Sequence, residues 1–284
     1  MIIKQIKTDK YIQKEKKNMF NFISFGSGSS GNCYYLYTEK DAIVIDTGIG
    51  IRQIKKYFAN YGLSLESIHH ILVTHDHIDH IKSVGSLSTQ LNIPVYASEK
   101  VHKSMLGNNF IKKKIEADNR RIIEANHSYH IGDFDVTTVQ VPHDSSNNIG
   151  YCIVYQDITF CLMTDIGHVT EEMAQFISRA NYLVIEANHD KELLQNGPYP
   201  KDLKIRVGGP NGHLSNEDCG EAIAQYANEK LKRVWLCHLS QDNNRPDIAV
   251  GTVKTLLKEA GGFKEVIPVE ALRRKIPSEI IKLI

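Results

Sequence analysis

Short apolar runs alternate with amphipathic stretches along most of the chain, a pattern typical of α/β proteins. From residue 19 it predicts two strands joined by the Gly/Ser turn "SGSSGNC", and a third strand, "AIVID", that ends at Asp46. Apolar residues spaced three and four apart predict a helix over 50–61. "IHHILVTH" predicts a buried strand, 81–91 a helix, and "IPVYAS" another strand.

The same alternation continues through the second half. We predict strands at "FDVTTVQVPH", "NYLVIEAN", "RVWLCHLS" and "KEVIPVE", a hairpin from "GYCIVYQ" and "ITFCLMTD", a Gly/Pro-rich loop over 196–216, and helices over 170–180, 216–230 (with Asn216 as N-cap) and 248–261. No linker or repeat divides these elements. We therefore expect one α/β domain over 19–284, preceded by a basic tail over 1–18 that could be disordered.

Composition narrows the setting in which the protein works. The 284 residues are 42% apolar and 24% charged, with a net charge of +1, as in an ordinary globular protein. No apolar run spans a bilayer, and the polar start lacks the apolar core of a secretory signal. Five scattered cysteines without a C-x-x-C pair indicate free thiols. We expect a cytoplasmic protein with no membrane partner; oligomeric state is not indicated.

Candidate chemistry concentrates in "VTHDHIDH", residues 73–80. In extended backbone His75 and His77 point the same way, while Asp79 and His80 begin a helix and face a second point. A single histidine after a strand is usually structural, but five ionisable groups in six positions are hard to explain by packing. Two such sets on opposite sides of one cavity predict a two-metal site.

Further polar residues follow other predicted strands. Asp46, His143, Asp165, Glu186 and His238 each lie at or near the carboxyl end of a strand, where the loops of α/β folds converge on one crevice.

These residues, in this order, resemble the metallo-β-lactamase fold superfamily. Further motifs are similar to its YycJ (WalJ) branch of DNA exonucleases: "SGSSGNCYYL", "HDSSNNIGY", "TDIGHV", "EANHD", "GHLSN" and "HLSQDNN". The resemblance spans about residues 19–270. It implies a four-layer αββα sandwich, with two mixed β-sheets flanked by helices, and hydrolysis of phosphodiesters by two divalent metal ions.

The resemblance also implies a role for each motif residue. His75, His77 and His143 would hold one metal, Asp79, His80 and His238 the other, and Asp165 would bridge them. Asp46 and Glu186 would stand behind the ligands and orient them. Ligands of this kind suit Zn²⁺, which we expect, or Mn²⁺ or Fe. A metal-bridging hydroxide would attack phosphorus, with Asp79 taking its proton.

Several residues are candidates for handling the substrate. We expect a histidine to give the leaving group its proton, and we favour His213 over His189 for this role. For both residues the alternative is a structural role as a loop histidine. Weaker candidates for substrate contact are Ser27, Ser30, Asn32, Arg206 and Arg245. The basic stretch 100–121 would contact nucleic acid if it flanks the cleft, and otherwise is an exposed charged face.

The favoured function is therefore that of a metal-dependent nuclease, similar to 5′-3′ DNA exonucleases. The alternative is a hydrolase of small molecules on the same fold, acting on a cyclic or other small phosphodiester, a thioester or a lactone. A non-hydrolytic di-iron or metal-binding protein is more remote, because His77 stands where flavo-di-iron proteins have a glutamate.

Overall fold

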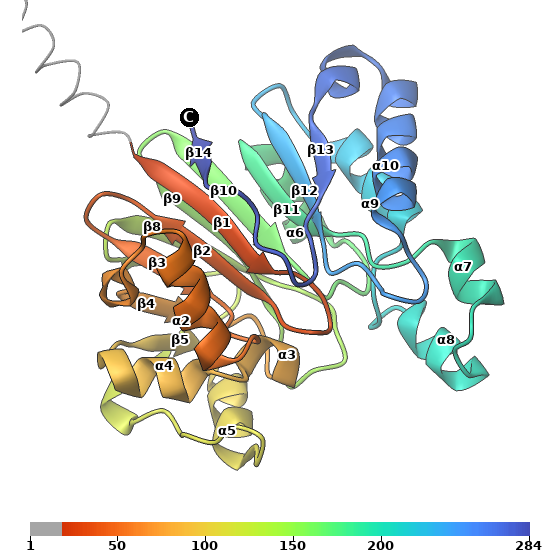
Figure 1. The fold of residues 1–284 in the computed structure, drawn as a ribbon. Coiled ribbons are helices and arrows are strands. Elements are labelled where there is room, and N and C mark those ends of the chain that lie inside the picture. Colours follow the sequence, from red (N-terminus) through yellow and green to blue (C-terminus); the bar gives the residue numbers. More distant parts are fainter. Residues whose placement is uncertain (1–18) are drawn as a thin grey trace, which may run out of the picture.

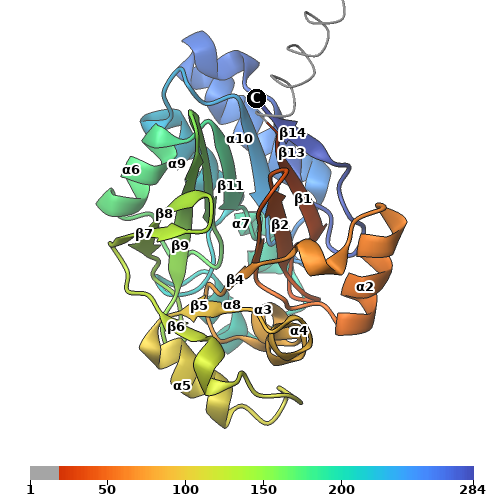
Figure 2. The ribbon, with the colours of Figure 1, turned by 90° about the vertical axis from the view of Figure 1, so that its left-hand side faces the viewer.

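Two mixed β-sheets of seven strands pack face to face in the computed structural model, which describes residues 19–284 (Figures 1 and 2). The expected tail over 1–18 lies outside the described residues. The first sheet has the order β14 (Ile281–Leu283), β1 (Phe20–Gly26), β2 (Cys33–Tyr37), β3 (Ala42–Ile45), β4 (His70–Leu72), β5 (Val95–Ala97), β6 (Arg120–Ile122). The second has the order β13 (Val269–Ala271), β12 (Arg233–Cys237), β11 (Tyr182–Glu186), β10 (Ile158–Met163), β9 (Ile149–Tyr155), β8 (Phe134–Gln140), β7 (Ser128–Ile131).

Helices cover the outer face of each sheet. Apolar side chains of α2 (Ile51–Asn60), α4 (Val84–Leu91) and α5 (Glu99–Gly107) join one core with the first sheet. Those of α6 (Glu171–Arg179), α9 (Asn216–Tyr226) and α10 (Pro246–Ala260) join another with the second. The predicted four-layer αββα sandwich is confirmed.

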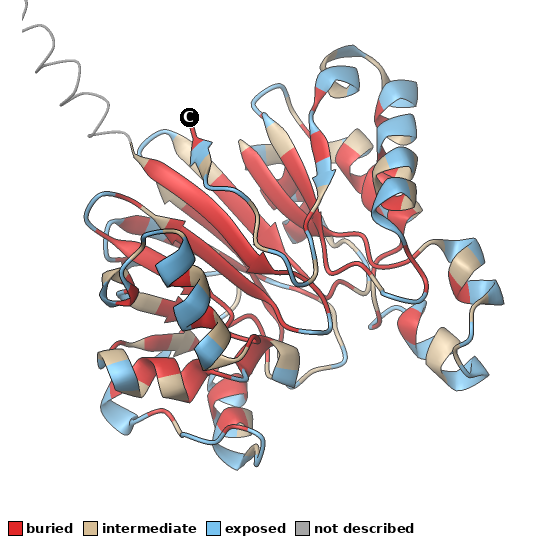
Figure 3. Cartoon of the chain, viewed as in Figure 1, coloured by how far each residue is buried: buried red, intermediate tan, exposed pale blue. Residues whose placement is uncertain are grey.

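A third core fills the space between the sheets. Phe22 of β1 lies with its ring centroid 5.0 Å from those of both Phe160 and Trp235 on the opposite sheet. Because both faces of the central strands are covered, these strands are apolar almost throughout, and β1 is buried at all seven positions (Figure 3). The packing of the two sheets fixes the positions of the strand ends, and with them the starting points of the loops.

Three short helices lie in those loops. They are α3 (Ile78–Ile81), directly after the histidine-rich stretch, and α7 (Lys191–Asn196) and α8 (Lys201–Val207), which project from one end of the second sheet (Figure 1). Every helix of the described residues falls short of the length and apolar character that crossing a bilayer requires. All five cysteines are buried and unpaired.

Some element predictions were wrong. The Gly/Pro-rich loop contains α8, which begins after Pro200, a residue that favours a helix start. The N-cap of α9 is Ser215, whose Oγ accepts a hydrogen bond from the Asp218 amide (3.0 Å), and the helix ends at Tyr226. The strand predicted at "KEVIPVE" is shorter than expected. Its first residues belong to a short 3₁₀ helix, η3 (Gly262–Val266), and only Val269–Ala271 pairs with β12.

Elements without a strong periodicity were missed. They are α5, α7, the edge strands β6, β7 and β14, and two 3₁₀ turns, η1 (Leu65–Ser67) and η2 (Ala117–Asn119). β14 pairs with β1 at the other end of the described chain, and β6 pairs with β5 beyond α5, so local pattern does not reveal these two strands.

Candidate metal centre

The ionisable residues predicted at strand ends meet at one end of the double sheet. Asp46 follows β3, His75 follows β4, Asp165 follows β10, and His238 follows β12. His143 comes from the loop between β8 and β9. The structure brings all seven predicted ligands together, in overlapping sets whose candidate ligand atoms lie within 4.8 Å of one another.

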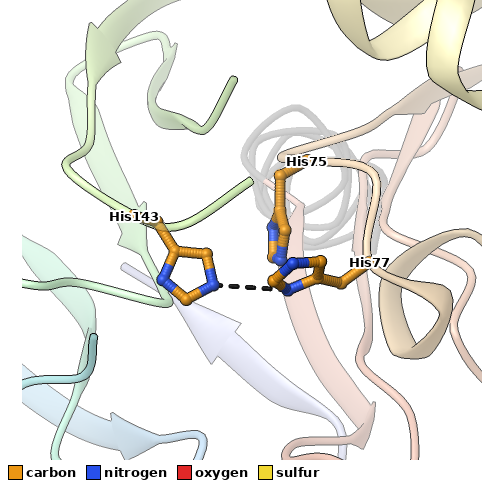
Figure 4. Close-up of side chains that lie close together, drawn as sticks. All are labelled: His75, His77 and His143. Carbon is orange, nitrogen blue, oxygen red and sulfur yellow. Dashed lines mark hydrogen bonds between the residues drawn. The ribbon is translucent and has the colours of Figure 1, made fainter. Parts of the chain in front are cut away.

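One set consists of three histidines, His75, His77 and His143 (Figure 4). Nε2 of His143 lies 3.3 Å from Nδ1 of His77. The other ring nitrogen of His143, Nδ1, lies 3.0 Å from the Gly212 carbonyl oxygen, to which it can donate. Nε2 of His75 is buried and has no hydrogen-bond partner within residues 19–284. Nitrogens from three rings thus converge on one point.

The other set consists of Asp79, His80 and His238. Oδ2 of Asp79 lies 3.4 Å from Nε2 of His238 and 3.7 Å from Nε2 of His80. Asp165 lies between the two sets: its Oδ2 is 3.2 Å from His80 Nε2, and its Oδ1 is 3.5 Å from His238 Nε2 and 3.7 Å from His143 Nε2.

Buried carboxylates hold the ring orientations from behind. Oδ2 of Asp46 is 2.7 Å from Nδ1 of His80, and the same carboxylate accepts hydrogen bonds from the amide and hydroxyl of Thr74 (2.9 and 2.8 Å). Oε1 of Glu186 is 3.1 Å from Nδ1 of His238 and 2.9 Å from Nδ1 of His213. Each contact occupies Nδ1 and leaves Nε2 for a ligand. Thr74 was not singled out from the sequence, although it adjoins His75.

Backbone strain collects at the same place. Asp46, Asp165 and His238 have backbone φ angles of 59°, 57° and 52°. These values lie in the left-handed region, which residues other than glycine rarely adopt. Each costs on the order of 1 kcal/mol or more and persists only where surrounding contacts impose it. For His238 the amide donates to Ser27 Oγ (3.0 Å), and the carbonyl accepts from Asn188 Nδ2 (2.8 Å).

Burial and neighbouring charges shift the pKa values of several residues at the site. Burial, reinforced by the charge of neighbouring His80, holds the pKa of His75 well below its usual range. Burial alone would raise the pKa of Asp79, but His80 and His238 outweigh it and lower that pKa to about 2. Burial would lower the pKa of His238, but Asp165, Asp79 and Glu186 outweigh it and raise that pKa to about 10. The carboxylate of Asp79 and the imidazole of His238 therefore shift each other's pKa in opposite directions.

The residues fit divalent cations. Neutral imidazole nitrogens and ionised carboxylate oxygens are the donors that Zn²⁺, Mn²⁺ and Fe share. The partnerless Nε2 of His75 is the kind of buried polar atom that needs a ligand to offset its desolvation.

The predicted proton donors lie at the rim. Nδ1 of His213 is bound to Glu186, and its side chain is 18% exposed. His189 is buried, and its Nδ1 has no hydrogen-bond partner among the described residues. Both line a hollow of about 810 Å³ that α7 and α8 border. His213 also lines a smaller hollow, of about 90 Å³, against His238.

The weaker substrate candidates are dispersed. Asn32 is buried, with Nδ2 2.9 Å from His80 Nε2, whereas Ser27 is buried against Tyr34 (2.9 Å between hydroxyl oxygens). Ser30 is exposed in the turn before β2. Exposed Arg206 pairs with Asp144, the neighbour of His143, and exposed Arg245 pairs with Asp247 in the first turn of α10. Of this group, Asn32 reaches a ligand side chain and Ser27 contacts the backbone of the ligand His238.

Comparison with known proteins identifies the family of the chain. The family model described as a beta-lactamase superfamily domain matches residues 41–239. Exodeoxyribonuclease WalJ of Streptococcus pneumoniae serotype 2 is 35% identical over 241 residues, which cover 85% of this chain and 89% of WalJ. Exodeoxyribonuclease YycJ of Bacillus anthracis is 34% identical over 264 residues, 92% of this chain and 98% of YycJ.

Solved structures show the same architecture. The metallo-β-lactamase fold protein YhfI of Bacillus subtilis superposes with a TM-score of 0.67 at 16% identity, over 92% of this chain and 99% of YhfI. Fold and site together define a metal-dependent hydrolase. The chain belongs to the metallo-β-lactamase superfamily, and within it to the family of the WalJ and YycJ exodeoxyribonucleases.

Proposed function

We propose that the chain degrades DNA from its ends by hydrolysing phosphodiesters, with two divalent ions at the metal centre. Zn²⁺ is the favoured ion, and Mn²⁺ and Fe are the alternatives. The observation that carries the proposal is the arrangement around Asp165. One carboxylate lies between a set of three histidines and a second set of two histidines and an aspartate. Exodeoxyribonuclease relatives matched over most of the chain support DNA as the substrate.

The ligand sets assign the ions. His75, His77 and His143 would hold one ion, Asp79, His80 and His238 the other, and Asp165 would contact both. Ions bound there would supply Lewis-acid chemistry, drawing charge from phosphoryl oxygens and making water more acidic. Asp46 and Glu186, bonded to Nδ1 of His80 and His238, would keep the rings oriented.

The remaining steps belong to side chains of the chain. Asp79 would accept the proton of the attacking water. A leaving alkoxide needs a proton donor, and His213 has the suitable placement: Glu186 holds its Nδ1, and the ring lines the hollow beside His238. His189, buried behind the larger hollow, is the second candidate.

The test is degradation of end-labelled double-stranded DNA by protein loaded with Zn²⁺ or Mn²⁺. The proposal predicts stepwise shortening from one end that chelator stops and that is absent with Asp79→Ala/His80→Ala. The double variant removes two ligands, so a circular dichroism spectrum must show that it still folds. Hydrolysis of small phosphodiesters without shortening of DNA would contradict the proposal and favour the small-molecule alternative.

A further inference from the structure

Three consecutive cations, Arg273, Arg274 and Lys275, lie on the loop between β13 and β14. They line a hollow of about 380 Å³ together with Ser27, Leu239 and Ser240. Leu239 and Ser240 also line the small hollow against His238. The hollow beside the cationic loop thus shares two of its lining residues with the hollow against His238.

The fold holds this loop in place. Tyr57 of α2 donates from its hydroxyl to the carbonyl of Lys275 (2.8 Å), and Tyr61, which directly follows α2, donates to the carbonyl of Ser278 (2.6 Å). The amide of Ser278 donates to the carbonyl of Ser24 in β1 (2.9 Å). Arg274 thus has a position set by packing, as ligand-binding side chains require.

Arg274 packs against the Gly/Ser turn that adjoins the ligands. A Cβ at Gly28 would lie 3.3 Å from Cγ of Arg274, so the two surfaces are in contact. The Gly28 amide donates to Oδ1 of Asn32 (2.8 Å), and Nδ2 of Asn32 lies 2.9 Å from Nε2 of His80. Two residues therefore separate Arg274 from a metal ligand.

One nitrogen of the Arg274 guanidinium lacks a hydrogen-bond acceptor among the described residues. Its Nη1 is buried, and no hydrogen-bond partner lies near it within residues 19–284. Asp242 and Tyr199 act on it electrostatically, yet neither forms an ion pair or hydrogen bond with it in the described structure. Arg206 and Arg245, by contrast, are paired with aspartates. A buried N–H of a charged group without a partner is costly, and this favours an acceptor from a ligand.

We propose that Arg274 binds a backbone phosphate of the DNA strand, next to the phosphate at the metal centre. This inference rests on the proposed function. The contact at Arg274 would be available to a polynucleotide and not to a small phosphodiester. A guanidinium fork matches two phosphate oxygens, and the adjoining Arg273 and Lys275 add positive potential along the strand. A small diester at the metal centre would not extend to this loop.

The test compares wild type with Arg274→Gln and Arg274→Lys, and with Arg52→Gln on the exposed face of α2 as a control of equal charge. Binding of a fluorescent single-stranded oligodeoxynucleotide, with phosphorothioate linkages that resist hydrolysis, to the metal-loaded protein is measured over a range of salt concentrations. We expect Arg274→Gln to raise Kd about tenfold or more and to lessen the slope of log Kd against log salt by about 0.7. Arg274→Lys should restore the slope more than the Kd.

Two further readings separate the possible failures. Metal-loaded Arg274→Gln should hydrolyse bis(p-nitrophenyl) phosphate like wild type, with a thermal midpoint within about 3 °C of it. Unchanged Kd and salt slope in Arg274→Gln, while wild type shortens DNA, would overturn this inference alone. Equal losses on DNA and on the small diester would reduce Arg274 to a structural residue. Wild type that shortens no DNA would overturn the proposed function, and this inference with it.

Discussion

At the scale of single residues, the site depends on which ring nitrogen each histidine leaves free. Glu186 binds Nδ1 of both His213 and His238, yet His238 Nε2 points to Asp79 while His213 lies at the exposed rim. One carboxylate thus orients a ligand and a candidate proton donor. His189, at the back of the neighbouring hollow, has no such partner within the described chain.

This difference predicts unequal effects of two substitutions. His213→Ala should lower kcat on DNA by about 10²- to 10⁴-fold, the usual contribution of a positioned general acid, and His189→Ala should lower it less. On bis(p-nitrophenyl) phosphate, whose leaving group needs no proton, the deficit of His213→Ala should nearly disappear. Steady-state kinetics on both substrates measure this. An equal deficit on both would mean that His213 acts on binding or structure instead.

At the scale of elements, asparagines lock the loops that follow β11 and β12. Asn244 and Asn216 exchange amide hydrogen bonds of 2.9 and 3.1 Å. Asn244 also donates to the carbonyls of Ala187 and Asn188 (2.9 and 3.0 Å). Since Asn188 in turn holds His238, this pair transmits the position of α9 to the ligand loop.

Breaking the pair should reveal coupling. Asn244→Ala removes the partner of the Asn216 side-chain amide and of the Ala187 carbonyl, whereas the Asn188 carbonyl still accepts from the Ser240 amide. It should therefore cost about 2–3 kcal/mol of unfolding free energy. Asn216→Ala removes one partner and should cost less. In urea denaturation the double variant should lose less than the sum of the single losses, because both remove the same contact. Strict additivity would show that the two side chains act independently.

At the scale of the whole molecule, Asp41 ties the two sheets together at the turn before β3. Its carboxylate accepts from the amides of Ala42 in the first sheet and Asp133 in the β7–β8 turn of the second, both at 2.8 Å. His69 Nδ1 lies 2.7 Å from the same group. Burial would raise the pKa of Asp41, but hydrogen bonds from His70, the Asp133 amide and His69 outweigh it and lower the pKa from 3.8 to about 2.

A carboxylate with a lowered pKa stabilises the folded state only while it is ionised. Asp41 should therefore contribute about 2 kcal/mol above its unfolded pKa, and this is lost as pH falls from 3.8 through about 2. The unfolding free energy of Asp41→Asn should lie furthest below that of wild type at neutral pH, and the gap should narrow over that window. Urea titrations at a series of pH values measure the gap. A gap that is constant with pH would refute the linkage.

Much of the architecture and the ligand set could be predicted from the sequence, because both have local signatures. The strands are short continuous apolar runs, and "VTHDHIDH" places four ligands within six residues. Contacts between distant segments could not be predicted. The pairing of β14 with β1 brings the loop of Arg274 to the turn at Gly28. In the basic segment 100–121, Lys114 and Arg120 donate hydrogen bonds to backbone carbonyls of the same segment.

The central claim is that two ligand sets meet at Asp165, and metal content tests it most directly. Protein reconstituted with Zn²⁺ and freed of excess ion is analysed by inductively coupled plasma mass spectrometry, beside His77→Ala and His238→Ala. We predict two ions per chain in wild type and about one in each variant, because each substitution removes a ligand from one set only. One ion in wild type, or two ions retained in both variants, would contradict the account.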